Sequence, residues 1–264
     1  MKSCVIYSNC QADGLALFLK AMRFPYQITI YRNYQMILGE QKISDLISDA
    51  RTADLLIYQP TNEKHGESSS HNILKALKPG CRSISFAYVY NHGMHPLTEH
   101  GTKWPGAEFI NPEYWQMTLP KILALYDAGE FDFALWPRFL HCLGEQATRE
   151  ATTDIKLTRW MANPINFERR LLLNVNHPTS YLFIEMAEQV MRLLDIQPNL
   201  HDLPVPTDAP SAENLANLPC TVPFSEYVRK EFSSYRKTDP EAHNFYRAYL
   251  QKLWRFNQDT HTQP

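Results

Sequence analysis

The chain has 264 residues, of which 44% are hydrophobic, 20% charged and 12% aromatic. This composition excludes a disordered chain, a fibrous repeat and a coiled coil, and the length predicts one large domain or two small ones. The 26 basic and 28 acidic residues give a net charge of −2, so we expect no nucleic-acid partner and no general attraction to an anionic membrane.

Targeting signals and cysteine usage indicate the compartment. No apolar run approaches the roughly 18–20 residues of a membrane span, and the amino terminus lacks the apolar stretch of a signal peptide. The five cysteines are scattered and contain no Cys-x-x-Cys pair, so neither a disulfide framework nor a structural zinc site is expected. We therefore expect a cytoplasmic protein.

The first ninety residues alternate between short β-rich runs and amphipathic helical patterns. The predicted strands cover residues 3–7, 27–32, 53–59 and 83–90. The predicted helices cover residues 15–22, 44–51 and 72–77, the second of them capped by Ser44. Strand and helix alternating at this spacing indicate right-handed βαβ units and a mainly parallel sheet of about four strands.

After residue 91 the pattern becomes mostly helical. A loop rich in His, Gly and Pro covers 91–112, and a short β-like segment is predicted at 170–175. The predicted helices cover residues 119–128, 144–161, 179–194, 224–235 and 240–257. The expected fold class is therefore α/β, with an N-terminal parallel sheet followed by a largely helical C-terminal half.

Three parts of the chain are expected from these patterns. An α/β core covers 1–197, a Pro-rich arm or linker covers 198–223, and C-terminal helices packed on the core cover 224–264. The last helix carries aromatic side chains with Lys and Arg between them. Docking on its own domain is the commoner use of such a helix, while contact with a membrane surface or a partner stays open.

Polar side chains follow each of the four predicted strands. They occupy residues 8–11, 33–34, 59–60 and 91–92. Because parallel sheets place ligands at the carboxyl ends of their strands, we expect a functional site at this edge.

Cys10 is the sharpest candidate for chemistry, because it lies on the turn between the first strand and the first helix. Unpaired backbone amides and the positive end of the helix dipole favour a thiolate there and can stabilise an oxyanion. Asn9 and Gln11 add side-chain amide donors of the kind used in an oxyanion hole. The alternative is that Cys10 is a small buried apolar residue.

His177 precedes a strongly amphipathic helix. Pro178 suits the first helical position, which would place His177 at or beside the cap. A helix amino terminus disfavours the imidazolium form, so we expect a neutral ring that can accept a proton. The alternative is a capping or core histidine bonded to the backbone.

Two further groups carry weaker signals. His92, His95 and His100 offer three imidazoles for zinc, but their spacing matches no standard ligand pattern, and a substrate-facing His92 is favoured over a metal site. Arg169 and Arg170 can bind phosphate, although a solvated pair or an ion pair with the preceding glutamate is equally consistent. The chain has no phosphate loop and no Gly-x-Gly-x-x-Gly motif.

Three blocks of the chain resemble the WcbI-type capsule polysaccharide biosynthesis proteins. They cover residues 5–11, 53–60 and 170–179, with the amphipathic helix behind the last, and together span about 3–195. The glycine that usually precedes Asn-Cys-Gln in this family is Ser8 here. If the position needs a positive φ, Ser8 is strained; otherwise its hydroxyl adds a hydrogen bond near the site.

The resemblance implies a cytoplasmic enzyme of surface-polysaccharide assembly that binds coenzyme A and acetylates a sugar. It points to Cys10, Gln11, Gln59, Asn176 and His177 as site residues. The expected reaction is acyl transfer from acetyl-coenzyme A to a sugar hydroxyl, with His177 deprotonating either the acceptor or Cys10. The expected partners are the acyl donor and a sugar, nucleotide-sugar or glycan acceptor, with no metal, and a homo-oligomer stays open.

Two rival functions remain. An SGNH-like esterase would use Ser8 or Cys10 as its nucleophile, but such enzymes carry a late Asp-x-x-His, and here Asn174 stands three residues before His177. A non-catalytic glycan-assembly subunit would use the many aromatic side chains for sugar stacking, although such side chains more often fill cores.

Overall fold

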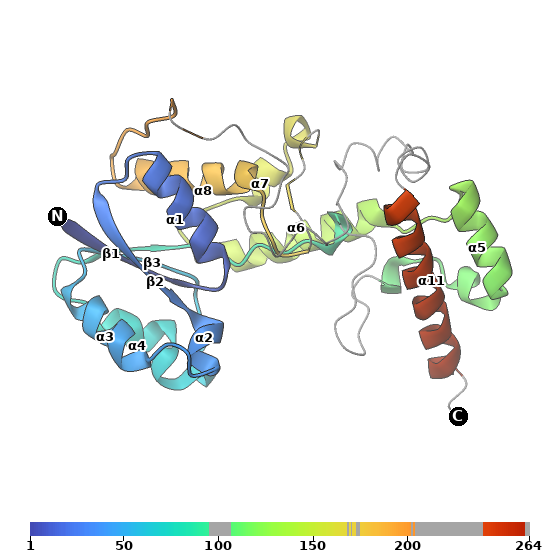
Figure 1. Cartoon of the computed structure of the whole chain (residues 1–264), viewed down its shortest axis with the longest axis horizontal. Helices are drawn as coiled ribbons and strands as arrows, with labels where there is room; N and C mark the ends of the chain where they lie inside the picture. Colours follow the sequence, from blue (N-terminus) through green and yellow to red (C-terminus); the bar gives the residue numbers. More distant parts are fainter. Residues whose placement is uncertain are drawn as a thin grey trace. The chain divides into compact units, whose positions relative to one another are not determined.

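The computed structural model describes residues 1–94, 107–167, 169, 171–172, 175–201, 203 and 240–261. They belong to two compact units, drawn in Figure 1. The first unit takes its described residues from 1–89, 146–161 and 178–211, and the second from 90–145, 162–177 and 212–264. The domain boundaries predicted from the sequence stay predictions.

The first unit is built on a four-stranded parallel sheet in the order β2-β1-β3-β4. The strands are β1 (Lys2–Ser8), β2 (Tyr26–Arg32), β3 (Leu55–Tyr58) and β4 (Arg82–Ser85). Ile6 of β1 pairs with Ile30 on one side and Ile57 on the other. The α/β fold class and the parallel sheet expected from the sequence are confirmed.

Helices cover both faces of this sheet (Figure 1). On one face, α1 (Gln11–Ala21) contacts α8 (Ser180–Leu193), and the rings of Phe18 and Phe183 stack at 6.3 Å. On the other face, α3 (Ile43–Thr52) and α4 (Ser70–Ala76) pack against β1 and β3. The shared core there contains Val5, Tyr7, Leu46, Ala50, Leu56 and Ile73. The first unit also contains α2 (Asn33–Ile37), the 3-10 turn η1 (Glu63–Ser68) and α7 (Thr158–Met161).

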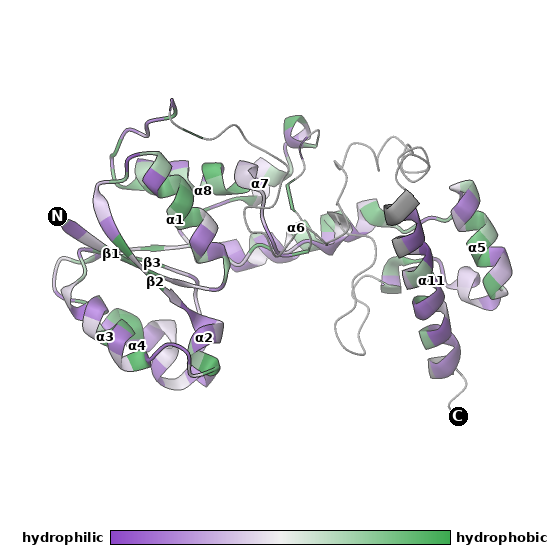
Figure 2. Cartoon of the chain, in the orientation of Figure 1, coloured by the Kyte–Doolittle hydropathy of each residue, from purple (hydrophilic) through white to green (hydrophobic). Residues whose placement is uncertain are grey.

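The second unit is helical. It contains α5 (Leu119–Ala128) and α11 (Pro240–His261), whose buried side chains share one core. Tyr246, Leu250 and Leu253 of α11 are buried at helical spacing. Figure 2 shows that hydrophobic residues are frequent along α5, whereas most of α11 is hydrophilic. The 3-10 turns of this unit are η2 (His92–Met94), η3 (Ala107–Phe109), η4 (Pro112–Gln116) and η5 (Pro164–Asn166).

The helix expected at 144–161 is wrong in its boundaries. The structure has α6 (Leu135–Glu150), which begins in the second unit and ends in the first, and then the separate short helix α7. The buried Glu150 carboxylate accepts hydrogen bonds from the backbone amides of Leu157 and Thr158, at 2.9 and 3.0 Å. These bonds fix a turn between α6 and α7, because they satisfy amides at the start of the second helix.

Three smaller predictions are also corrected. Ser44 lies inside α3, whose cap is Lys42, and its hydroxyl bonds Asp45 instead. The fourth strand ends at Ser85 rather than near residue 90. Pro178 precedes the cap of α8, which is Thr179.

The helix expected at 224–235 and most of the Pro-rich arm lie outside the described residues. Within the part of the chain that the structure describes, no helix combines the length and apolar character needed to cross a membrane.

Candidate functional site

A cavity of about 440 Å³ lies at the carboxyl edge of the sheet in the first unit. Asn9 follows β1, Asn33 follows β2, Gln59 follows β3, and Ala87 comes shortly after β4. The complete lining is Asn9, Asn33, Gln59, Pro60, Thr61, Asn62, His65, Ala87, Tyr88, Arg149 and Thr153. We call it the strand-end cavity. It lies where the topology of a parallel sheet places a ligand.

A network of buried amides fixes the turn beside this cavity. The Gln59 side chain accepts from the Asn9 backbone amide at 3.1 Å and donates to the Gln11 side-chain oxygen at 3.0 Å. Gln11 donates in turn to the Val89 carbonyl at 3.0 Å, and the Asn9 side chain accepts from the Gln11 amide at 2.9 Å. Gln11 and Gln59 are 1% and 4% exposed. Because buried polar groups are costly unless bonded, the network sets the conformation of the Asn-Cys-Gln turn.

Gln11 therefore has a different environment from the one expected. The sequence suggested an amide donor open to an oxyanion, whereas the Gln11 amide donates to the Val89 carbonyl inside the protein. Its geometry supports a role in positioning the turn. A direct contact between Gln11 and substrate stays a prediction.

Cys10 is the half-buried N-cap residue of α1. Burial raises the pKa of its thiol, and the nearby Asp13 carboxylate raises this pKa further, while its own backbone amide and Arg32 act in the opposite direction. Arg32 is engaged by Asp13, with Nε to Oδ2 at 2.8 Å. The backbone amide at the helix terminus favours the thiolate, as expected, but desolvation outweighs the amide and the guanidinium, so the net shift favours the neutral thiol.

Ser8 is not strained. Positive φ values occur at Arg23, Ala134 and Asp195 among the described non-glycine residues, and not at Ser8. The buried Ser8 hydroxyl donates to the Asn9 carbonyl at 3.0 Å. The Ser8 hydroxyl thus adds a hydrogen bond to the turn, which is the second of the two alternatives expected from the sequence.

His177 and Asn176 belong to the second unit, where both are half-buried. Burial lowers the pKa of His177, so its imidazole is neutral at physiological pH as expected. The cause differs from the expected helix terminus, since α8 begins at Ser180, beyond its cap Thr179. The convergence of His177 with Cys10, which lies in the first unit, stays a prediction.

His92 lies in the second unit and is only 4% exposed. Its Nδ1 accepts from Nε of the buried Arg138 at 3.4 Å, and its ring lies near those of Tyr90 and Phe109. Burial, together with the charges of Arg138 and His141, lowers the pKa of His92 to about 4. Because β4 ends at Ser85, His92 does not adjoin a strand end, and a substrate contact through it stays a prediction.

The remaining residues predicted for the site are two histidines and two arginines. His95 and His100 lie outside the described residues, and the described ranges contain no group of three His, Cys, Asp or Glu side chains placed to hold a metal ion. Arg169 donates to the Asn166 side chain at 2.8 Å. Arg170 also lies outside the described residues.

Among the residues of the strand-end cavity that were missed in the sequence, two carry basic side chains, His65 and Arg149. His65 follows β3 in η1, so its place after a parallel strand was an available signal. Arg149 lies in the last turn of α6, far along the chain from every strand, and no local pattern indicated it. Its Nη2 donates to the Gln146 side chain at 2.9 Å.

Known proteins with similar sequence or structure place the chain in a family. The family model described as polysaccharide biosynthesis enzyme WcbI matches residues 3–199. A solved structure described as native WcbI, a polysaccharide biosynthesis enzyme, without a disulfide bond between coenzyme A and one of its cysteines, has the same fold. It is 19% identical, with a TM-score of 0.60 over 97% of this chain and 99% of that one. None of the curated proteins matches. The match over 3–199 shows that the chain belongs to the WcbI family of polysaccharide biosynthesis enzymes.

Proposed function

We propose that the chain is a coenzyme A-dependent acyltransferase that moves an acyl group, most simply acetyl, onto a sugar hydroxyl. The observation that carries this proposal is the strand-end cavity, which is lined by polar side chains and bordered by the fixed Asn9–Gln11 turn. The family's role in polysaccharide biosynthesis supports a sugar acceptor. The coenzyme A named for the solved WcbI structure supports the donor.

The lining of the strand-end cavity fits coenzyme A in its chemistry. The Arg149 guanidinium can pair with phosphate oxygens, and the side-chain amides of Asn33 and Asn62 can bond the amides of the pantetheine arm. When bound, acyl-coenzyme A supplies the acyl group as a thioester.

In the proposed step, which needs the predicted convergence of His177 with the turn, His177 takes the proton of the acceptor hydroxyl, because burial keeps its imidazole neutral and thus able to accept a proton. The hydroxyl oxygen bonds to the acyl carbon as the carbon–sulfur bond breaks. The proton held by His177 then passes to the departing sulfur. The side-chain amide of Asn9, which lines the cavity, stabilises the oxyanion, a contribution typically worth about 10²–10³ in rate for such a donor.

Cys10 is proposed to remain a neutral thiol during this direct transfer, since burial raises its pKa. Intact mass spectrometry after incubation with acetyl-coenzyme A tests this point. Direct transfer predicts no added acetyl group on the wild-type chain and continued turnover by Cys10→Ala. An acetyl adduct that disappears in Cys10→Ala, together with lost turnover, would establish the covalent route instead.

The function itself is tested by measuring thiol release from acetyl-coenzyme A with and without a panel of sugar acceptors. We expect release that depends on an acceptor and a new ester on the sugar. Hydrolysis of a simple aryl ester without coenzyme A, in the absence of acceptor-dependent release, would show an esterase. Neither activity, with no stabilisation by coenzyme A, would indicate a binding subunit.

A further inference from the structure

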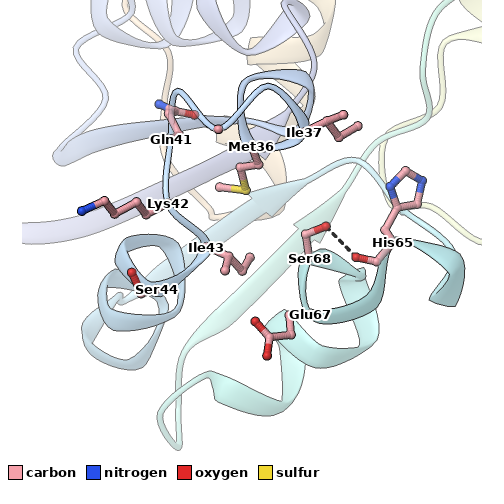
Figure 3. A pocket seen from close by; sticks show the side chains of 10 residues that line it. Met36, Ile37, Gln41, Lys42, Ile43, Ser44, His65, Glu67 and Ser68 are labelled. Atoms are coloured by element: carbon pink, nitrogen blue, oxygen red, sulfur yellow. Dashed lines mark hydrogen bonds between the residues drawn. The ribbon is translucent and has the colours of Figure 1, made fainter.

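A second cavity of about 570 Å³ lies in the first unit, between the α2–α3 connection and η1 (Figure 3). It is lined on one side by Met36, Ile37 and Ile43 and on the other by His65, Glu67 and Ser68. We call it the η1 cavity. Sequence patterns gave no indication of it, because its two sides come from loops around different strands.

His65 lines both the η1 cavity and the strand-end cavity. Two ligands, one in each cavity, would therefore approach each other at this side chain. A group-transfer reaction needs this arrangement, because donor and acceptor must meet while each is held by its own contacts.

The η1 cavity combines apolar and polar surfaces. Figure 3 shows Met36 and Ile43 on one side of the cavity, with Ser68 and Glu67 on the η1 segment on the other. The Ser68 hydroxyl donates to the His65 carbonyl at 2.8 Å, which fixes the turn that carries both side chains. A sugar ring has the matching character, since its C–H groups can pack on aliphatic side chains while its hydroxyls bond carboxylate and hydroxyl oxygens.

Charge distinguishes the two cavities. The strand-end cavity contains Arg149, which suits phosphates, whereas the η1 cavity contains the Glu67 carboxylate, which repels them. Lys42 also lines the η1 cavity, but its exposed side chain extends away from Glu67 in Figure 3. The η1 cavity is thus better suited to an uncharged ligand than to the acyl donor.

We infer that the η1 cavity binds the uncharged sugar ring of the acceptor and presents a hydroxyl toward the strand-end cavity past His65. This inference rests on the proposed function for the acceptor's role, while sugar binding itself can be measured separately. It assigns Glu67 as a binding residue that bonds sugar hydroxyls and disfavours anionic sugars.

The test uses the full chain labelled with ¹³C at its methionine methyl groups, with the Met36 signal assigned from a Met36→Leu variant. Glucose, galactose, mannose and N-acetylglucosamine are titrated, and glucuronate serves as the anionic counterpart. We expect at least one neutral sugar to shift the Met36 signal saturably, and glucuronate to bind at least about tenfold more weakly. No shift with any neutral sugar, or equal binding of glucuronate, would overturn the inference.

Glu67→Gln supplies the matched variant, because Glu67 is exposed and its replacement leaves no buried group without a partner. It should weaken neutral-sugar binding about tenfold. Glu63→Gln, an exposed glutamate of the same turn that lines neither cavity, should leave binding unchanged. Equal binding by Glu67→Gln and the wild type would contradict the assigned contact.

Coenzyme A added to the same sample separates the inference from the proposed function. Stabilisation by coenzyme A without a sugar-induced Met36 shift would refute the sugar site and leave the donor site intact. A sugar-induced shift without any coenzyme A binding would support the sugar site and refute the proposed function. A Met36 shift caused by coenzyme A that blocks sugar binding would show that the donor occupies the η1 cavity, and would overturn the inference.

Discussion

Polar side chains expected at the site differ between the two units in whether they face a cavity. In the first unit, Asn9 and Gln59 bond within one network while still lining a cavity. In the second unit, His92 pairs with the buried Arg138 next to the rings of Tyr90 and Phe109. Internal partners are thus common to both units, and what distinguishes Asn9 and Gln59 from His92 is that they also face the strand-end cavity.

Replacement of His177 and of His92 by alanine should separate a catalytic from a structural role most strongly. His177→Ala should lower kcat by about 10²–10⁴-fold, because it removes the proposed proton acceptor. His92→Ala should reduce stability instead, because it removes the acceptor of the hydrogen bond from the buried Arg138 Nε. Kinetics and urea unfolding of both variants provide the measurement. Lost activity with unchanged stability in His92→Ala would show that His92 acts in the reaction and not in stabilising the fold.

The amide network predicts the next largest effect. Gln59→Leu should lower the free energy of unfolding by about 2–4 kcal/mol, because the half-buried Asn9 amide and the buried Gln11 side-chain oxygen each lose a hydrogen bond. The matched control is Gln27→Leu, at an exposed position of β2, which should change it by less than about 0.5 kcal/mol. Similar stabilities for the two variants in urea unfolding would show that the network is not structural.

Acid should lower the stability of the folded chain through the protonation of His92. The folded chain binds the His92 proton only near pH 4, whereas the unfolded chain binds it near 6.5. The free energy of unfolding should therefore fall as the pH drops from 6.5 to 4, by up to about 3 kcal/mol from this residue. Urea unfolding of the wild type and His92→Gln at several pH values checks this. An equal pH dependence of the free energy of unfolding in both chains would contradict the assignment of this effect to His92.

Replacing one glycine in each unit by alanine should give the smallest changes in stability. A Cβ at Gly14 of α1 would lie 2.3 Å from the Phe183 ring, so Gly14→Ala should cost about 1–3 kcal/mol of stability. A Cβ at Gly144 of α6 would meet nothing within 4 Å. Gly144→Ala should therefore stabilise the chain by about 0.5–1 kcal/mol. The midpoint temperatures of thermal unfolding of the two variants should shift in opposite directions. Shifts in the same direction would contradict the different packing of the two glycines.

Local sequence patterns were sufficient for much of the fold. The buried run of β1 and the amphipathic spacing of α5 and α8 predicted those elements almost residue by residue, because each buries one consistent surface. The boundaries of α6 and α7 were wrong because the Glu150 carboxylate, a contact made only in the folded chain, ends one helix and begins the next.

The site was less predictable than the sheet. The strand ends indicated Asn9 and Gln59, since the topology of a parallel sheet brings them to one edge. Arg149 reaches the same cavity only through the path of α6, and the raised pKa of Cys10 depends on how deeply the folded chain buries it. Such features depend on packing between distant segments, which the spacing of residues along a chain does not record.

Titration calorimetry with coenzyme A tests the central claim, that the strand-end cavity holds the donor. The wild-type chain and Arg159→Gln, which changes an exposed arginine outside the cavity, should bind alike. Arg149→Gln should bind at least about tenfold more weakly, because a guanidinium–phosphate bond is lost. Absence of binding to the wild type, or equal affinity in Arg149→Gln, would contradict the account.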